Sequence, residues 1–133
     1  RRPADPTSSR IAATLGAGSG ATLTITHVRP RPMGLAFGSA GAVEYEQAED
    51  ALDAEVARVA ADRLAAYPGD WKVVVRQGHV AQELLAVADE VDADLVVLGH
   101  RSRGTVRDAI LGSAASSTVH HSRRNVLVAV PPR

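Results

Sequence analysis

The chain of 133 residues contains no cysteine. This absence excludes disulfides, thiolate metal ligands and a cysteine nucleophile, and it gives no support to an oxidising destination. No apolar run approaches the ~18 residues that a membrane span needs, and no charged-then-apolar signal segment opens the sequence. We therefore expect a soluble, cytoplasmic protein. The length predicts a single domain over residues 1–133, with a core large enough to be stable without covalent cross-links.

Aromatic residues and lysine are also scarce: aromatics make up 3% of the chain, and Lys72 is the single lysine. Without rings interleaved with cations, the chain offers no stacking surface for unpaired bases, so a nucleic-acid binder is disfavoured. A phosphate loop that ends in Gly-Lys-Ser/Thr is excluded, because Lys72 lies in a predicted strand. No Gly-x-Ser-x-Gly elbow or His-Glu-x-x-His motif occurs, so we predict neither catalytic residues nor a metal site.

The charges sum to zero but are unevenly distributed. Residues 44–70 hold eight acids against two arginines, a local charge of −6, whereas residues 99–133 hold six arginines against Asp108, a local charge of +5. We interpret the acidic stretch as a solvated face. The basic stretch could attract a phosphate but lacks the breadth of a nucleic-acid surface.

Hydrophobic periodicity predicts strands that alternate with helices. The expected strands are 22–28, 71–75, 93–98 and 126–130, and the expected helices are 44–67, 80–91 and about 114–121. Residues 1–20 suggest a loop interrupted by about two helical turns, and residues 29–43 form either a lid or a plain loop. Because the later strands are apolar on both faces, we predict an α/β fold with an open, doubly wound parallel sheet.

A glycine-rich region follows the strand 93–98, where ligands gather in open parallel sheets. Gly99 permits a sharp turn and a close approach to the main chain. Ser113 would cap the helix that follows, whose free amides would form an anion site with Arg101, Arg103 and Arg107 nearby. The alternative is that Gly99 only turns the chain and Ser113 only caps a helix, and composition favours the two about equally.

Several segments resemble the universal stress protein family, from about residue 20 onward. The matching segments are Gly20–Leu23, Thr26–Val28, the long acidic helix, Val73–Gly78, Asp92–Gly99 and Asn125–Val130. The diagnostic pattern is Gly-x2-Gly-x9-Gly-Ser/Thr, the family's signature for the ribose and phosphates of ATP. Here it runs from Gly99 to Gly112-Ser113 with its spacing intact, and Ser102 replaces the second glycine.

The resemblance implies a Rossmann-like fold of the adenine nucleotide alpha hydrolase type, with a mostly parallel five-stranded sheet and helices on both faces. It implies ATP as the ligand, alone or with Mg²⁺, and a homodimer through Val126–Val130. It also implies the roles of individual residues. Backbone contacts to adenine would come from Val28, contacts to ribose and phosphate from Gly99, Arg101 and Ser102, and contacts to phosphates from Gly112, Ser113 and Ala114.

Two departures from the family keep a second interpretation open. One is Ser102, whose Cβ could obstruct the phosphates, and the other is the opening strand of the family, central in the sheet, which is not evident before Thr22. We expect that strand to be formed by residues that are missing from the given sequence, either before Arg1 or between the early segments of the chain. We predict a nucleotide-binding sensor or regulator and not a turnover enzyme. The alternative is a nucleotide-independent member that acts through dimerisation and partner contacts. An adenylyl-transferring enzyme is disfavoured, because the glycine region contains no lysine and no carboxylate other than Asp108.

Overall fold

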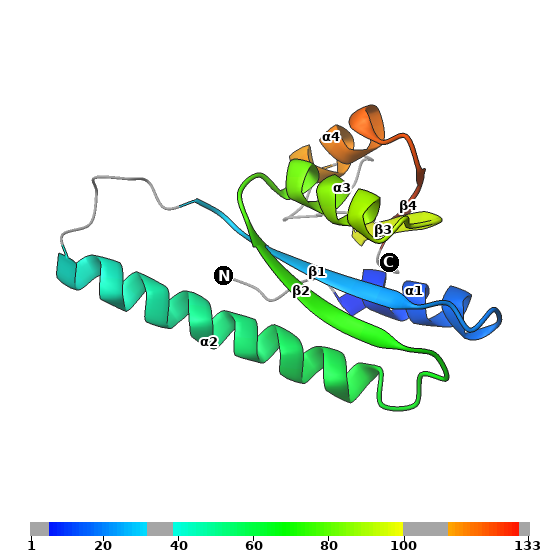
Figure 1. Cartoon of the computed structure of the whole chain (residues 1–133), viewed down its shortest axis with the longest axis horizontal. Coiled ribbons are helices and arrows are strands. Elements are labelled where there is room, and N and C mark those ends of the chain that lie inside the picture. Colours follow the sequence, from blue (N-terminus) through cyan, green and yellow to red (C-terminus); the bar gives the residue numbers. More distant parts are fainter. Residues whose placement is uncertain (1–5, 32–38, 100–111, 131–133) are drawn as a thin grey trace.

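The computed structural model describes residues 6–31, 39–99 and 112–130. Helices and strands alternate along these residues (Figure 1). In chain order they are α1 (Pro6–Ala17), β1 (Leu23–Arg29), α2 (Ser39–Arg63), β2 (Trp71–Gln77), α3 (Val80–Glu90), β3 (Leu95–Gly99), α4 (Ser113–His121) and β4 (Asn125–Ala129). This alternation confirms the α/β class.

The four described strands form two separate parallel pairs. β1 pairs with β2 in the register Leu23↔Trp71, and β3 pairs with β4 in the register Leu95↔Asn125. The parallel pairing agrees with the prediction, but the expected five-stranded sheet is divided into two two-stranded sheets within the described residues. The resemblance implies a central strand that would join the two pairs, and no such strand lies among the described residues.

Helices cover both faces of the strands (Figure 1). On one side, α2 contacts β1 and β2, while α1 contacts α2, β1, β3 and β4. On the other side, α3 contacts β1 and α4, and α4 contacts β4. Because α1 touches strands of both pairs, it holds the two halves of the sheet together.

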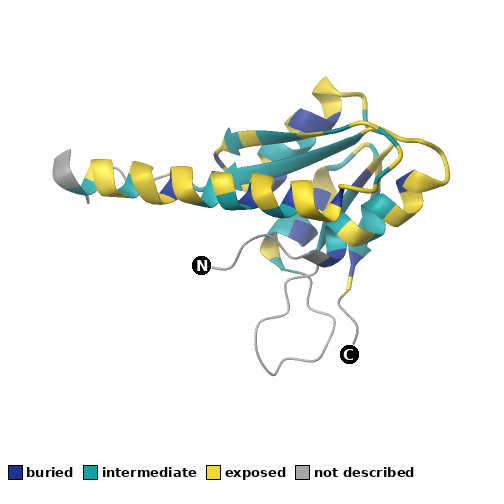
Figure 2. Cartoon of the chain, turned by 90° about the horizontal axis from the view of Figure 1, so that it is seen from below, coloured by how far each residue is buried: buried dark blue, intermediate teal, exposed yellow. Residues whose placement is uncertain are grey.

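The core is made of small and aliphatic side chains from the inner faces of these elements. The buried apolar residues are Val56, Ala60, Leu64, Ala81, Val87, Ala88, Val96, Ala115 and Ala129. On α2 they recur at helical spacing, and Figure 2 shows the buried positions separated by exposed ones along this helix. The same figure shows that α2 extends beyond the strands at its N-terminal end.

Two helices differ from the sequence prediction. α1 is a full helix of 12 residues where about two turns were expected, because Pro6 suits the first helical position and small residues with good helix propensity follow. α2 begins at Ser39 instead of residue 44 and ends at Arg63 instead of residue 67. The chain tightens after Arg63, with Tyr67 N donating to Leu64 O at 3.0 Å, since a residue before proline disfavours the helix.

The remaining elements agree with the prediction to within two residues at each end. β2 continues to Gln77 and β3 covers Leu95–Gly99. β4 covers Asn125–Ala129 instead of 126–130, so Val130 lies just outside it. Gly78 ends β2 with φ +147°, a backbone conformation that residues with a Cβ rarely adopt.

Candidate functional site

The start of α4 carries main-chain amides that have no partner inside the helix. Gly112 occupies the N-cap with φ −55° and ψ 157°, and its carbonyl accepts the first helical hydrogen bond from Ser116 N at 2.9 Å. The amides of Ser113 and Ala114 precede that bond and are therefore free of helical acceptors. The sequence predicts Ser113 as the cap. The structure corrects this by one residue, because Gly112 is the N-cap and Ser113 is already the first helical residue.

The orientation of α4 is fixed by its buried face. Ala115 is 2% exposed and Thr118 is fully buried, and Thr118 Oγ1 donates to Ala114 O at 2.7 Å. Ser113, on another face of the first turn, is exposed. A helix anchored in this way presents its N-terminal amides and the positive end of its dipole at a fixed place, an arrangement that suits an anion.

Gly99 is the last residue of β3 and pairs with Ala129 of β4. It therefore lies at the carboxyl end of a parallel strand, where sequence analysis expected it. Arg101 and Ser102, predicted to contact ribose and phosphate, lie outside the described residues.

Val28 occupies the penultimate position of β1, and its main-chain groups point away from β2. Leu23 N donates to Asp70 O and Gly78 N donates to Arg29 O, both at 2.9 Å, so the odd-numbered residues of β1 bond to β2. Alternate residues of a parallel strand bond to opposite neighbours. The N–H and C=O of Val28 are therefore directed to the edge of β1 opposite β2, which no other described strand occupies.

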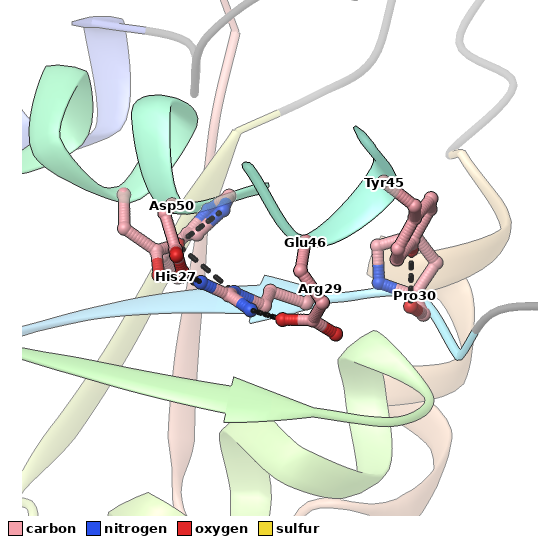
Figure 3. A network of polar contacts seen from close by, with 7 residues as sticks. His27, Arg29, Pro30, Tyr45, Glu46 and Asp50 are labelled. Carbon is pink, nitrogen blue, oxygen red and sulfur yellow. Dashed lines mark hydrogen bonds and ion pairs between the residues drawn. The ribbon is translucent and has the colours of Figure 1, made fainter. Parts of the chain in front are cut away.

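A polar network that the sequence interpretation missed lies beside this strand end (Figure 3). Arg29 bonds Asp53 and Asp50 of α2, the latter at 2.8 Å, and reaches Glu46 at 3.4 Å. His27 Nε2 lies 3.6 Å from Asp53 Oδ1. The network ties α2 to the carboxyl end of β1.

Arg29 is the centre of this network because its side chain is only 15% exposed and meets three carboxylates. The hydrogen bonds that Arg29 donates to Asp53 and, to a smaller extent, to Asp50 raise the pKa of Arg29. Part of the acidic stretch is thus an ion-pair face and not only a solvated one. The signal in the sequence was the spacing of residues 46, 50 and 53, which puts three acids on one helix face opposite an arginine at a strand end.

Other chemistry finds no support in the described part of the chain. No cluster of three metal-binding side chains occurs among those residues. A hollow of about 430 Å³ lies elsewhere, between α1 and the end of α2, and its lining contains none of the predicted site residues. Within residues 6–31, 39–99 and 112–130, no helix combines the length and apolar character needed to cross a bilayer.

Known proteins resemble this chain in sequence and in fold. The sequence model of the universal stress protein family matches residues 5–130. Universal stress protein G of Shigella flexneri is 37% identical over 82 residues, which are 62% of this chain and 54% of that protein. The chain therefore spans about half the length of the curated relatives it matches.

Two solved structures show the same fold. Universal stress protein UspA from Lactobacillus plantarum superposes with a TM-score of 0.76 at 21% identity, covering 96% of this chain and 93% of that one. A universal stress protein solved in complex with cAMP gives a TM-score of 0.62 at 26% identity, covering 92% and 84%. The Rossmann-like α/β assignment is confirmed by these neighbours.

Proposed function

The chain belongs to the universal stress protein family, and we propose that it binds an adenine nucleotide as a cytoplasmic sensor or regulator in the stress response. The nucleotide is ATP, alone or with Mg²⁺, and the binding unit is one domain over residues 1–133. The role is regulatory and not enzymatic.

The observation that carries the proposal is the pair of amides at Ser113 and Ala114, which have no acceptor within α4. They follow a glycine N-cap, on a helix whose opposite face is anchored by Ala115 and Thr118. Such amides, together with the helix dipole, bind phosphate oxygens without any side-chain charge. In the proposal they hold the phosphates, while Gly99 at the end of β3 allows ribose and phosphate to approach the main chain.

Two further observations support an adenine nucleotide in particular. The main-chain N–H and C=O of Val28 point to the edge of β1 opposite β2, a donor and acceptor pair of the kind that an adenine edge can bond. The 26% identical relative was solved with cAMP, which shares its adenosine moiety with ATP. Arg101 and Ser102 complete the proposed contacts to ribose and phosphate.

Calorimetric titration of nucleotide-stripped protein with Mg-ATP tests this proposal. We expect micromolar binding by the parent chain and a loss of about 100-fold or more in Gly112→Asp, because a carboxylate would then face the phosphates. The control is His120→Asp, which also introduces a carboxylate but at an exposed position in the last turn of the same helix. This variant should bind Mg-ATP like the parent. Equal affinity in Gly112→Asp and the parent would contradict the site.

The Ser102→Gly variant addresses the departure from the family signature. Binding by the parent means that the serine is accommodated. Binding by Ser102→Gly alone would contradict the proposal for the natural chain and favour a member whose ATP pocket is closed.

A nucleotide-independent role through dimerisation is the second candidate, and one observation favours it. β4 has β3 as its one hydrogen-bonded neighbour among the described strands, and Val130, just after β4, is 64% exposed. A free strand edge beside an exposed valine is a surface that a second copy could cover.

A further inference from the structure

The hollow between α1 and the end of α2 is a part of the molecule that the proposed nucleotide contacts do not use. Its volume of about 430 Å³ is within the range of about 300–1,000 Å³ that small-molecule sites occupy. One wall is a stripe of α1, and the other is formed by residues 63–68, the end of α2 and the turn that follows. That turn leads into the first residue of β2, so the hollow lies towards the amino ends of the strands, whereas the proposed nucleotide contacts lie at the carboxyl ends.

The charged side chains of this hollow are all of one sign. Arg10 lies on the α1 wall and Arg63 on the α2 wall, and none of the described residues that line the hollow is acidic. Among the residues that the structure describes, neither guanidinium has an ion-pair partner. Asp62, next to Arg63 in the sequence, pairs with Arg58 at 2.9 Å instead. The hollow therefore carries two cationic groups whose charge no described carboxylate offsets.

The surface between the two arginines is mainly apolar. Ala13 and Ala17 lie one turn apart on the stripe of α1 that lines the hollow. The opposite wall contributes Leu64, Ala66 and Pro68. Leu64 is only 2% exposed, so it lies at the base of this wall. The hollow thus combines two cations with an apolar surface that suits an aliphatic or aromatic body.

Tyr67 fixes one end of the hollow. Its hydroxyl donates to Ala21 O, which ties the turn after α2 to the loop before β1. Gly16 makes this contact possible, because a Cβ at that position would overlap the Tyr67 hydroxyl. The Gly16 carbonyl accepts hydrogen bonds from Ser19 N and Ala21 N, both at 3.1 Å, so the loop that Tyr67 contacts is itself held in place. A ligand that enters here meets a wall that is already ordered, which reduces the entropic cost of binding.

We propose that this hollow binds a small organic anion with one carboxylate and an apolar body. An arginine guanidinium matches a carboxylate with two parallel hydrogen bonds, and the two arginines approach from separate helices. The C-terminal end of α2, which is the negative end of its dipole, lies beside the hollow. A phosphate group with two charges is therefore disfavoured relative to a single carboxylate. The apolar body is covered by the alanine, leucine and proline side chains of the two walls.

Octanoate is the probe for this chemistry, and 1-octanol is the matched control because it has the same chain length without the charge. NMR titration of the ¹⁵N-labelled chain measures affinity and position together. We expect saturable shifts centred on the amides of Ala13, Ala17 and Ala66 with octanoate. Binding of 1-octanol should be about tenfold weaker, since it forms no ion pair with arginine. Equal affinity for the two compounds, shifts centred on other elements, or no saturable binding at millimolar octanoate would overturn the proposal.

Substitutions of the two arginines separate the charge of the hollow from its shape. Arg10→Gln and Arg63→Gln each remove one cation from an exposed position, so the fold should be kept and octanoate binding should weaken by about fivefold. The affinity for 1-octanol should not change. The control is Arg123→Gln, at an exposed arginine outside the hollow, which should bind octanoate like the parent. Unchanged affinity in both hollow variants would contradict the site and would leave Arg63 only the role of complementing the α2 dipole.

Competition with Mg-ATP shows whether octanoate occupies the proposed nucleotide site instead. None of the residues that line the hollow is among the proposed nucleotide contacts, so the two sites are independent. Saturating Mg-ATP should therefore leave the affinity for octanoate unchanged. Displacement of octanoate by Mg-ATP would contradict the assignment to this hollow.

Discussion

At the scale of single residues, Arg29 joins a strand end to the long helix α2. It is 15% exposed and bonds carboxylates at three positions of α2. Because its folded-state pKa is raised above the unfolded value, mainly by the bond to Asp53, its stabilisation is present at every pH below the unfolded pKa, which includes the neutral range. The network thus fixes α2 beside the strand end that also carries Val28.

We expect Arg29→Ala to lower the free energy of unfolding by about 1–2 kcal/mol, since Asp53 would stay largely buried without its cation. Urea denaturation at neutral pH measures this. The control is Arg58→Ala, which removes an arginine that bonds Glu55 and Asp62 but is 60% exposed, and its effect should be much smaller. Equal losses in the two variants would show that burial of the network is unimportant.

The positions at the proposed site that could be predicted from sequence are those that depend on local spacing. Gly99, Gly112 and Ser113 were recognisable because a strand end, a glycine turn and a helix start leave a linear signature. The Arg29 network was missed because its partners are far apart in the sequence. The sequence of an acidic stretch is the same whether its side chains face solvent or form ion pairs with a residue at a strand end. Only the fold distinguishes these two cases.

At the scale of elements, α3 shows that the burial of a position decides what its side chain contributes to stability. Val87 is 2% exposed, whereas Val80, on the same face but at the first position of the helix, is 45% exposed. We expect Val87→Ala to cost about 2 kcal/mol from lost burial and a residual cavity. Val80→Ala should be close to neutral, because little area is lost and alanine favours the helix. Thermal or urea unfolding of both variants measures these changes in the free energy of unfolding. A larger loss in Val80→Ala than in Val87→Ala would contradict the packing of α3.

The strands and the two later helices were predicted more accurately than α1 and α2. Runs of β-branched residues bounded by proline and glycine identified β1, β2 and β4 to within two residues. α1 was underestimated because its residues are small and lack a strong apolar stripe, so its packing against β1, β3 and β4 had no signal in the sequence. The early start of α2 was missed for the same reason, since residues 39–42 are serine, glycine and alanine.

At the scale of the whole molecule, the two strand pairs and the helices that cover them determine where partners can bind. The proposed association with a second copy runs through the edge of β4 that no other described strand occupies. The proposed nucleotide contacts lie at the carboxyl ends of β1 and β3 and at the start of α4. The order of the strands could not be derived from composition or periodicity, because it depends on long-range pairing.

Light scattering coupled to gel filtration tests the association through β4. We expect a mass twice that of the 13.9 kDa chain for the parent and a monomer for Val130→Asp, because a carboxylate would enter the apolar contact. Val119→Asp, at a valine that is 43% exposed on α4, should leave the dimer intact. A monomeric parent, or a dimer that survives Val130→Asp, would contradict association through this strand.

The central claim is that the free amides at the start of α4 bind nucleotide phosphates beside the ends of β1 and β3. NMR titration of ¹⁵N-labelled protein with Mg-ATP tests it most directly, because it reports binding and position together. We predict that the largest shifts will occur at Val28, Gly99 and Gly112 to Ala114, with little change at Thr24 and Thr26. Shifts confined to other elements, or none at millimolar ATP, would contradict the account.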